Sequence, residues 1–127
     1  MTDFRTEIFE LVNNNEYNFY KLYIDDVSHF DEFCKKIETF YREKKSLESI
    51  IALMDSFSAS LLLPKKKFRQ INGIKRQDVF EFKKDNVRVY VIKDDTNKEF
   101  YVVMGGLKKE QDADLKRLQT RIKGFKE

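Results

Sequence analysis

Three short runs of alternating apolar and polar residues lie between positions 78 and 109 and form the clearest pattern in the chain. The runs are 79–83, 87–93 and 99–104. Alternation with a period of two is typical of half-buried strands. The residues between the runs are rich in Asp and Asn, which favour tight reversals. The pattern therefore predicts an antiparallel meander of three strands.

Side chains alternate between the two faces of a strand, so the meander predicts an apolar face and a polar face. If the first turn closes as a four-residue loop, Glu81 lies opposite Arg88. The predicted apolar face consists of Phe80, Phe82, Val87, Val89, Val91, Phe100, Val102 and Met104. The opposite face collects Glu81, Arg88, Tyr90 and Tyr101, with Lys108 and Lys109 at its rim. Charged and aromatic groups are thus expected together on one side of the sheet.

Two helices are predicted before the meander. Ser28 with Asp31 three residues later is close to a capping box with a shorter acid. Apolar residues then recur at three- and four-residue spacing over 30–41, and after a break at 43–46 the spacing returns over 47–61. Pro64 ends the segment, because the residue before a proline is pushed out of helical space. Two antiparallel helices packed on a sheet would follow.

The two ends of the chain give weaker signals. Residues 4–12 have a mixed pattern that fits a helix or a first strand, and 13–16 is a turn signal. Residues 17–24 are rich in aromatic side chains, which favours a strand, so the two runs together would make a hairpin. After the meander, 110–122 has one apolar helical stripe, and Gly124 suits a helix stop.

Length and composition fit one globular domain. The 127 residues are long enough for one core and short for two. Charged residues make up 37% and hydrophobic ones 41%, which does not indicate disorder. We therefore expect an α+β fold over residues 1–127, in which a helical hairpin packs on one side of a twisted antiparallel sheet and a C-terminal amphipathic helix follows.

The sequence gives no sign of a membrane or export segment. No apolar run approaches the roughly 20 residues of a membrane span, and the start lacks the basic-then-apolar order of a signal peptide. The single cysteine, Cys34, excludes an internal disulfide and fits a reducing compartment. We therefore expect a cytoplasmic protein with no membrane partner.

The net charge of +3 is unevenly distributed along the chain. Residues 1–63 carry 7 Lys/Arg and 12 Asp/Glu, whereas residues 64–127 carry 18 Lys/Arg and 10 Asp/Glu. Concentrated basic charge attracts polyanions through counterion release, but it also suits an acidic protein partner. Lys65, Lys66 and Lys67 begin a basic run that fits either a contact with ribosomal RNA or a solvated loop.

Most metal and acid–base signatures are absent from the sequence. One histidine and one cysteine cannot build a His/Cys zinc site, and there is no Gly-rich phosphate loop or Gly-x-Ser-x-Gly elbow. His29 suits a surface or capping role, and Cys34 suits a small core or boundary position. RNA cleavage without histidine catalysis remains possible, because Arg and Lys can stabilise the charge that develops when a 2′-OH attacks the adjacent phosphate. A Lys among other cations can also have its pKa lowered enough to transfer protons.

The order of these segments resembles the RelE/HigB superfamily of bacterial toxins, particularly its phage-derived branch. The resemblance rests on Val-Phe-Glu-Phe at 79–82, Asn-Val-Arg-Val-Tyr-Val-Ile at 86–92 and Phe-Tyr-Val-Val-Met-Gly-Gly-Leu-Lys-Lys at 100–109. It covers roughly residues 65–125, and the order and spacing of the segments carry it, since no single motif is specific.

The resemblance implies a RelE-like arrangement of one domain. Residues 1–16 would be an N-terminal extension, and 17–63 would supply the first strand of the sheet and the helical hairpin. Residues 64–127 would supply the basic loop, the three-stranded meander and the C-terminal helix.

The function that the resemblance implies is that of a toxin from a type II toxin–antitoxin pair. Such a toxin would be a ribosome-associated endoribonuclease, an mRNA interferase that cleaves mRNA through 2′-OH attack with Arg and Lys stabilisation. Bases would stack on aromatic side chains, and a cognate antitoxin protein would cover the basic face. No metal or organic cofactor is implied, and the sequence leaves a homodimer open.

Two residues match basic positions of the family. Arg88 matches the strand arginine that holds the scissile phosphate, and it also suits a cross-strand ion pair with Glu81. Lys108 matches the basic residue after the last strand, a candidate for stabilising the phosphate or the leaving group, and it also suits a solvated position before a helix. Lys109 is a weaker candidate for substrate binding.

Other candidate residues depart from the family pattern or have a second explanation. Glu81 lies near where potent ribosome-dependent members carry lysine; it could serve as a general base, but it would also repel phosphate. Tyr90 and Tyr101 could stack on a base or simply pack in the sheet. The C-terminal helix lacks a Tyr or His where several relatives carry a catalytic one. Two alternatives follow: a gyrase-inhibiting, ParE-like toxin, or a non-catalytic module on the same fold that binds nucleic acid or protein.

Overall fold

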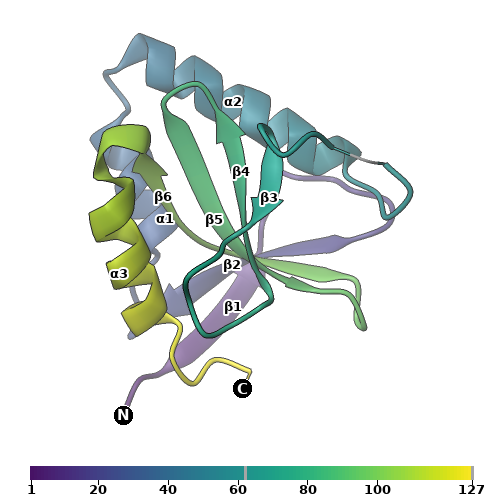
Figure 1. Ribbon diagram of the computed structural model, residues 1–127, viewed down its shortest axis with the longest axis vertical. Helices are drawn as coiled ribbons and strands as arrows, with labels where there is room; N and C mark the ends of the chain where they lie inside the picture. The colour runs from purple at the N-terminus through teal and green to yellow at the C-terminus, as the bar shows by residue number, and fades with distance from the viewer. Residues whose placement is uncertain (62, 127) are drawn as a thin grey trace.

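The fold is α+β, as the sequence predicts, and the described residues form one six-stranded sheet with helices on both faces (Figure 1). The structure is a computed structural model and describes residues 1–61 and 63–126. The elements in chain order are β1 (Phe4–Ile8), β2 (Asn18–Ile24), α1 (His29–Lys36), α2 (Tyr41–Ser56), β3 (Phe68–Gln70), β4 (Val79–Lys84), β5 (Val87–Asp94), β6 (Glu99–Leu107), the 3-10 turn η1 (Lys108–Glu110) and α3 (Gln111–Arg121).

The strands lie in the order β1-β2-β6-β5-β4-β3. All neighbours are antiparallel except β2 and β6, which run parallel. The expected purely antiparallel sheet is therefore wrong at this one pair, because the segment from α1 to β5 acts as a crossover connection between β2 and β6. The predicted N-terminal hairpin is present as β1 and β2, and it extends the sheet by an edge strand.

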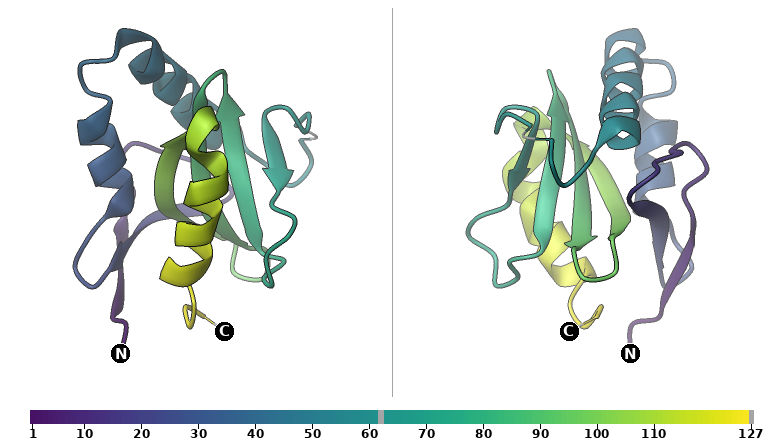
Figure 2. Two further views of the ribbon diagram at one scale, coloured as in Figure 1. Left: turned by 60° about the vertical axis from the view of Figure 1, so that its left-hand side comes forward. Right: turned by 90° about the vertical axis from the view of Figure 1, so that its right-hand side faces the viewer.

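Two apolar layers hold the helices to the sheet. Helices α1 and α2 cover one face and α3 covers the other, as both views of Figure 2 show. The first layer includes Phe33 of α1, Ile50 of α2 and Val89 of β5. The second includes Leu118 of α3 and Ile92 of β5. The predicted placement of a helical pair on one side and a C-terminal amphipathic helix is confirmed.

The boundaries of the helical pair differ from the prediction. The first helix ends at Lys36 and the second begins at Tyr41, so the break falls at 37–40 and not at 43–46. Ile37 stays fully buried at the break and anchors the chain there while it changes direction. The second helix ends at Ser56, before the predicted residue 61, and the side-chain amide of Asn14 donates to carbonyl oxygens that the helix end leaves free, including that of Met54 at 2.8 Å.

The β4–β5 hairpin is tighter than expected. Lys84 pairs with Val87, so only Asp85 and Asn86 form the loop, and Asp85 takes a positive φ of 50°. Asp tolerates this conformation better than most residues. The predicted pairing of Glu81 with Arg88 is wrong: Glu81 lies opposite Tyr90. The register is displaced by two residues, which leaves every side chain on its predicted face.

A bulge in β6 corrects one residue of the predicted apolar face. Tyr90 pairs with Met104 but Val91 pairs with Val102, so Val103 is an extra residue in β6. Met104 consequently joins the layer under α3 and not the layer under α1 and α2. Gly105 then faces α1, where an added Cβ would lie 2.2 Å from the ring of Phe33.

None of the helices described is long and apolar enough to cross a bilayer.

Candidate functional site

A buried carboxylate surrounded by cationic side chains lies on the α3 face of the sheet, where β4, β5 and the start of α3 meet. We call this group the Glu81 cluster and define it as Arg69, Glu81, Lys83, Arg88, Tyr90, Lys108 and Gln111. Strand pairing builds it: Arg69 of β3 and Tyr90 of β5 lie on either side of Glu81 in β4. The next row places Lys83 directly opposite Arg88. The predicted residues Glu81, Arg88 and Lys108 are therefore brought together.

Glu81 is completely buried and is held by three side chains. The Nε of Arg69 forms an ion pair with its Oε2, and Gln111 Nε2 donates to its Oε1 at 2.9 Å. The Nε of Arg88 lies 3.7 Å from the same Oε1. A buried carboxylate needs such partners, because removing it from water is costly. The carboxylate therefore fixes the positions of two guanidinium groups.

Arg88 is nearly enclosed, with 9% of its side chain exposed. Its Nη1 donates to the carbonyl oxygens of Asp85 at 2.8 Å and Val87 at 3.1 Å. Its buried Nε has no hydrogen-bond partner within the described part of the chain. A buried donor of this kind usually finds a partner in a native protein. The guanidinium is thus positioned by backbone oxygens and keeps unused donor capacity.

Lys83 is a half-buried residue of the cluster that the sequence analysis missed. Its pKa is lowered, first by partial burial and then by the charges of Arg69, Arg88 and Lys108, while Glu81 acts in the opposite direction. An amine in this environment gives up its proton more readily than a free lysine. The Asp-Asn pair at the turn was the available signal, since a two-residue loop there places Lys83 opposite Arg88.

Arg69 was also missed as a site residue. It lies in β3, a strand of three residues that follows the basic run and lacks a clear alternating pattern. The run itself, Lys65–Lys67, forms an exposed turn before β3. The carbonyl oxygen of Lys67 accepts a hydrogen bond from the backbone N–H of Lys83 at 2.8 Å, so the basic turn lies beside the cluster.

Lys108 and Lys109 begin η1 and are both exposed. The backbone N–H of Lys108 donates to the carbonyl oxygen of Asn86 at 2.8 Å. This bond fixes the end of β6 against the β4–β5 turn. It also explains why Lys108, distant in sequence, contributes to the electrostatic environment of Lys83.

Tyr90 forms the floor of the cluster. Its ring is fully buried under α3, and the side chain of Gln111 lies beside its hydroxyl. Burial, and then the charges of Glu81 and Asp114, raise the pKa of this hydroxyl well above its ordinary value. The ring presents no open face on which a base could stack.

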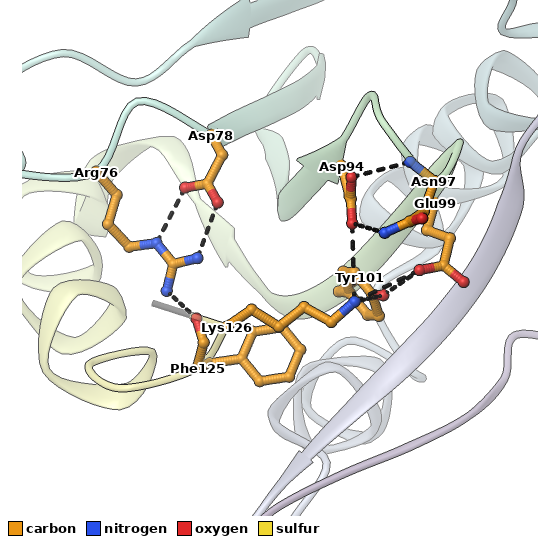
Figure 3. A network of polar contacts seen from close by, with 8 residues as sticks. All are labelled: Arg76, Asp78, Asp94, Asn97, Glu99, Tyr101, Phe125 and Lys126. Atoms are coloured by element: carbon orange, nitrogen blue, oxygen red, sulfur yellow. Dashed lines mark hydrogen bonds and ion pairs between the residues drawn. The ribbon is translucent and has the colours of Figure 1, made fainter.

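Tyr101 lies away from the cluster, in a polar network that holds the C-terminal segment (Figure 3). Its hydroxyl donates to Glu99 and accepts a hydrogen bond from Lys126, and its ring packs edge-on against Phe125 at 5.1 Å between centroids. It pairs with Ile92, four positions along β5 from Arg88. Both tyrosines predicted to bind substrate are therefore enclosed in the apolar layer under α3.

No metal or thiol centre accompanies the cluster in the part of the chain that the structure covers. No group of three or more His, Cys, Asp or Glu is arranged there to hold a metal ion. His29 Nδ1 lies 2.6 Å from Glu32 Oε1 in the first turn of α1, and Ser28, not His29, caps the helix. Burial raises the pKa of the Cys34 thiol to about 11, which disfavours the nucleophilic thiolate.

The chemistry available at this site is recognition and stabilisation of an anion. Arg69 and Lys108 are exposed, Lys83 is half-buried, and the donors of Arg88 lie beneath them. A phosphate at this corner would meet cationic groups from β3, β4, β5 and η1. Comparison with protein-family models and with curated proteins yields no match for this chain.

Proposed function

We propose that this chain is a toxin of the RelE/HigB superfamily that cleaves mRNA on the ribosome. The observation that carries the proposal is the Glu81 cluster, in which Arg69, Lys83 and Lys108 surround the buried pair of Glu81 and Arg88. A surface of this kind suits the phosphodiester backbone of RNA.

The order of elements also supports the proposal. A strand, two helices, a three-stranded meander and a helix occur in this order as β2, α1, α2, β4, β5, β6 and α3, with the short β3 inserted between α2 and β4. This is the sequence of elements that the resemblance implies, with β2 in the sheet as its first strand and β1 as part of an extension. The residues carried over from the resemblance, Arg88 and Lys108, lie at one corner of that sheet.

The proposed reaction needs no group beyond these side chains. The 2′-oxygen attacks the adjacent phosphorus, the bond from phosphorus to the 5′-oxygen breaks, and the products are a 2′,3′-cyclic phosphate and a 5′-hydroxyl. Lys83 accepts the proton of the 2′-OH, since its pKa is lowered. Arg69 and Arg88 stabilise the charge on the non-bridging oxygens, and Lys108 donates a proton to the leaving 5′-oxygen.

Glu81 takes a positioning role in this scheme. Its carboxylate is fully enclosed and engaged by Arg69 and Gln111, so a substrate proton does not reach it in this arrangement. Its charge reduces the repulsion between Arg69, Lys83 and Arg88, and thereby keeps them close enough together for one phosphate to meet all three.

The test is inducible expression in bacteria with mapping of mRNA 5′ ends. The double variant Lys83→Ala/Lys108→Ala removes two charges from side chains that reach solvent, so the fold is retained. Lys116→Ala/Lys123→Ala is the matched control, since both of these lysines are exposed and lie on or just after α3. We expect growth arrest and new mRNA ends with the wild type and with the control, and neither with the cluster variant.

The other outcomes separate the alternatives. Growth arrest with stalled replication and no new mRNA ends would contradict the ribonuclease and indicate a gyrase-inhibiting toxin. Absence of arrest from well-folded wild-type protein would contradict a toxin and leave a binding module. New ends that persist in the Lys83→Ala/Lys108→Ala variant would show that cleavage occurs elsewhere.

A further inference from the structure

A groove of about 460 Å³ lies on the far side of the β4–β5 turn from the Glu81 cluster. The start of α2 forms one wall and the turn forms the other; Figures 1 and 2 show the turn beside α2 and near the start of α3. It is lined by Tyr41, Arg42 and Lys45 of α2 and by Lys84 of β4, among others. The function proposed above does not use these residues.

Tyr41 is the most unusual residue of the groove. Its side chain is 73% exposed, and it and its neighbour Phe40 are the two aromatics among the large hydrophobic side chains that the described residues expose. The Nζ of Lys45 lies 5.7 Å from the centre of the Tyr41 ring. An exposed aromatic ring beside cationic side chains is the arrangement on which single-stranded nucleic acids stack their bases.

The groove has cationic side chains on both of its walls, on α2 and on β4. Arg42, Lys45 and Lys84 line it, against Glu43 and Asp85. Asp85 accepts a hydrogen bond from the hydroxyl of Ser46 at 3.3 Å, and Lys45 lies 3.6 Å from Glu48 outside the lining. Because Lys45 already has Glu48 as a partner, Arg42 and Lys84 are the lining cations that we assign to contacts with phosphate.

The groove and the cluster lie on opposite faces of the β4–β5 hairpin, and the tip of the hairpin, Asp85 and Asn86, lines the groove. Lys83 and Lys84 are consecutive in β4, so their side chains point to opposite faces of the sheet, one toward the cluster and the other toward the groove. Lys108 is tied to the tip by its bond to Asn86. A strand that passes the cluster would meet a lysine on each side of the tip.

We propose that this groove binds the segment of single-stranded RNA that continues from the scissile phosphate. A base stacks on Tyr41, and Lys84 contacts a phosphate close to the one that Lys83 meets. The inference rests on the proposed ribonuclease function, and it makes the groove a second subsite that sets how long an RNA the protein recognises.

The experiment measures fluorescence polarisation of labelled RNA with 2′-O-methyl groups throughout, which block cleavage. Two lengths are compared: a tetranucleotide that spans the cluster and a dodecanucleotide that also reaches the groove. We expect Tyr41→Ala to weaken binding of the longer RNA about 10-fold and to leave the shorter one unchanged, whereas Tyr41→Phe retains affinity. Lys84→Ala should lower the salt dependence of the longer complex by about 0.7 in log–log slope.

Matched controls are Leu11→Ala, an exposed apolar residue near the N-terminal hairpin, and Lys116→Ala on α3. One outcome would overturn the groove subsite and leave the role of the cluster intact: Lys83→Ala/Lys108→Ala weakens binding of both RNAs, and Tyr41→Ala affects neither. Loss of affinity in Tyr41→Phe as large as in Tyr41→Ala would contradict stacking. No binding of either RNA by the wild type would overturn the groove subsite, whereas the proposed cleavage on the ribosome is decided separately by the mapping of mRNA ends described above.

Discussion

Lys83 and Arg88 face each other directly across the antiparallel pair of β4 and β5. Two like charges in this position destabilise a sheet by themselves, and the buried carboxylate of Glu81 in the same strand offsets part of the repulsion. The arrangement is costly for the fold and useful for binding an anion, because the two cations are held together before a phosphate arrives.

Replacing Lys83 should separate stability from activity. We expect Lys83→Met to raise the free energy of unfolding by about 0.2–1 kcal/mol, because it removes the like-charge pair, and to abolish RNA cleavage. Urea denaturation and mRNA end mapping measure the two effects. Lys84→Met, on the neighbouring position, is the control and should not stabilise the sheet. A less stable Lys83→Met protein would contradict the like-charge interpretation.

The same residue should give a pH signature. The pKa of Lys83 is lowered from 10.5 by burial and by neighbouring cations, so the unfolded chain binds more protons than the folded one between the two values. The stability of the wild type relative to Lys83→Met should therefore rise as the pH increases through the alkaline range toward 10.5. Urea midpoints for the two proteins from pH 7 upward measure this difference, and a constant difference would be evidence against the lowered pKa.

Loss of the buried carboxylate should be among the most damaging single changes. Glu81→Ala leaves Arg88 enclosed without its counter-charge, and we expect unfolding to become easier by about 3–5 kcal/mol. Arg69→Ala, which removes the exposed partner of the same carboxylate, should cost less because Gln111 and Arg88 remain. Chemical denaturation of both variants provides the measurement. Equal losses would argue against Glu81 as the organising charge.

The close contact of Gly105 with α1 predicts a steric penalty and its relief. An added methyl group would lie 2.2 Å from Phe33, so Gly105→Ala should destabilise the fold by about 1–3 kcal/mol. Phe33→Leu creates space at the same point, and the double variant should lose less stability than the sum of the single ones. A double-mutant cycle by thermal or urea unfolding tests the coupling; additive losses would mean that the glycine is needed for another reason.

Cys34 should be slow to alkylate in the native protein. Burial raises its pKa to about 11, so at pH 8 the thiolate is about 100-fold scarcer than for a free cysteine. Iodoacetamide labelling followed by mass spectrometry, with and without urea, measures the ratio of the two rates. Similar rates in both conditions would show that the thiol is more open than the structure has it.

Periodicity carried the prediction of the fold as far as local pattern allows. The alternation over residues 79–104 and the helical spacing over residues 30–61 identified the meander and the helical pair, because a buried face imposes its period on the sequence. The register of β4 against β5 depends on a single turn. Residues 83–86 can form a four-residue loop or a two-residue loop, and the positive φ of Asp85 belongs to the two-residue loop that the structure has. The bulge at Val103 likewise cannot be predicted from the alternation of apolar and polar residues.

The candidate site was predictable only in part for a related reason. Glu81 and Arg88 share a face whichever closure the turn adopts, so their proximity followed from the pattern. Arg69 reaches Glu81 through a strand of three residues, too short for a periodic signal. Tyr90 and Tyr101 are buried by α3 and the C-terminal segment. The alternating pattern of the strands does not predict that a later helix covers this face of the sheet.

The parallel pairing of β2 with β6 also has a kinetic consequence. It joins residues 18–21 to residues 99–102, so the centre of the sheet closes only after residues 99–102 have been synthesised. Contacts between segments so far apart slow folding, because a long loop must be ordered first. During translation β1, β2, α1 and α2 are therefore synthesised well before β6, against which β2 pairs. Lys108 and Gln111 emerge later still. The Glu81 cluster is therefore assembled after the central strands, which delays any activity that depends on it until Gln111 has emerged.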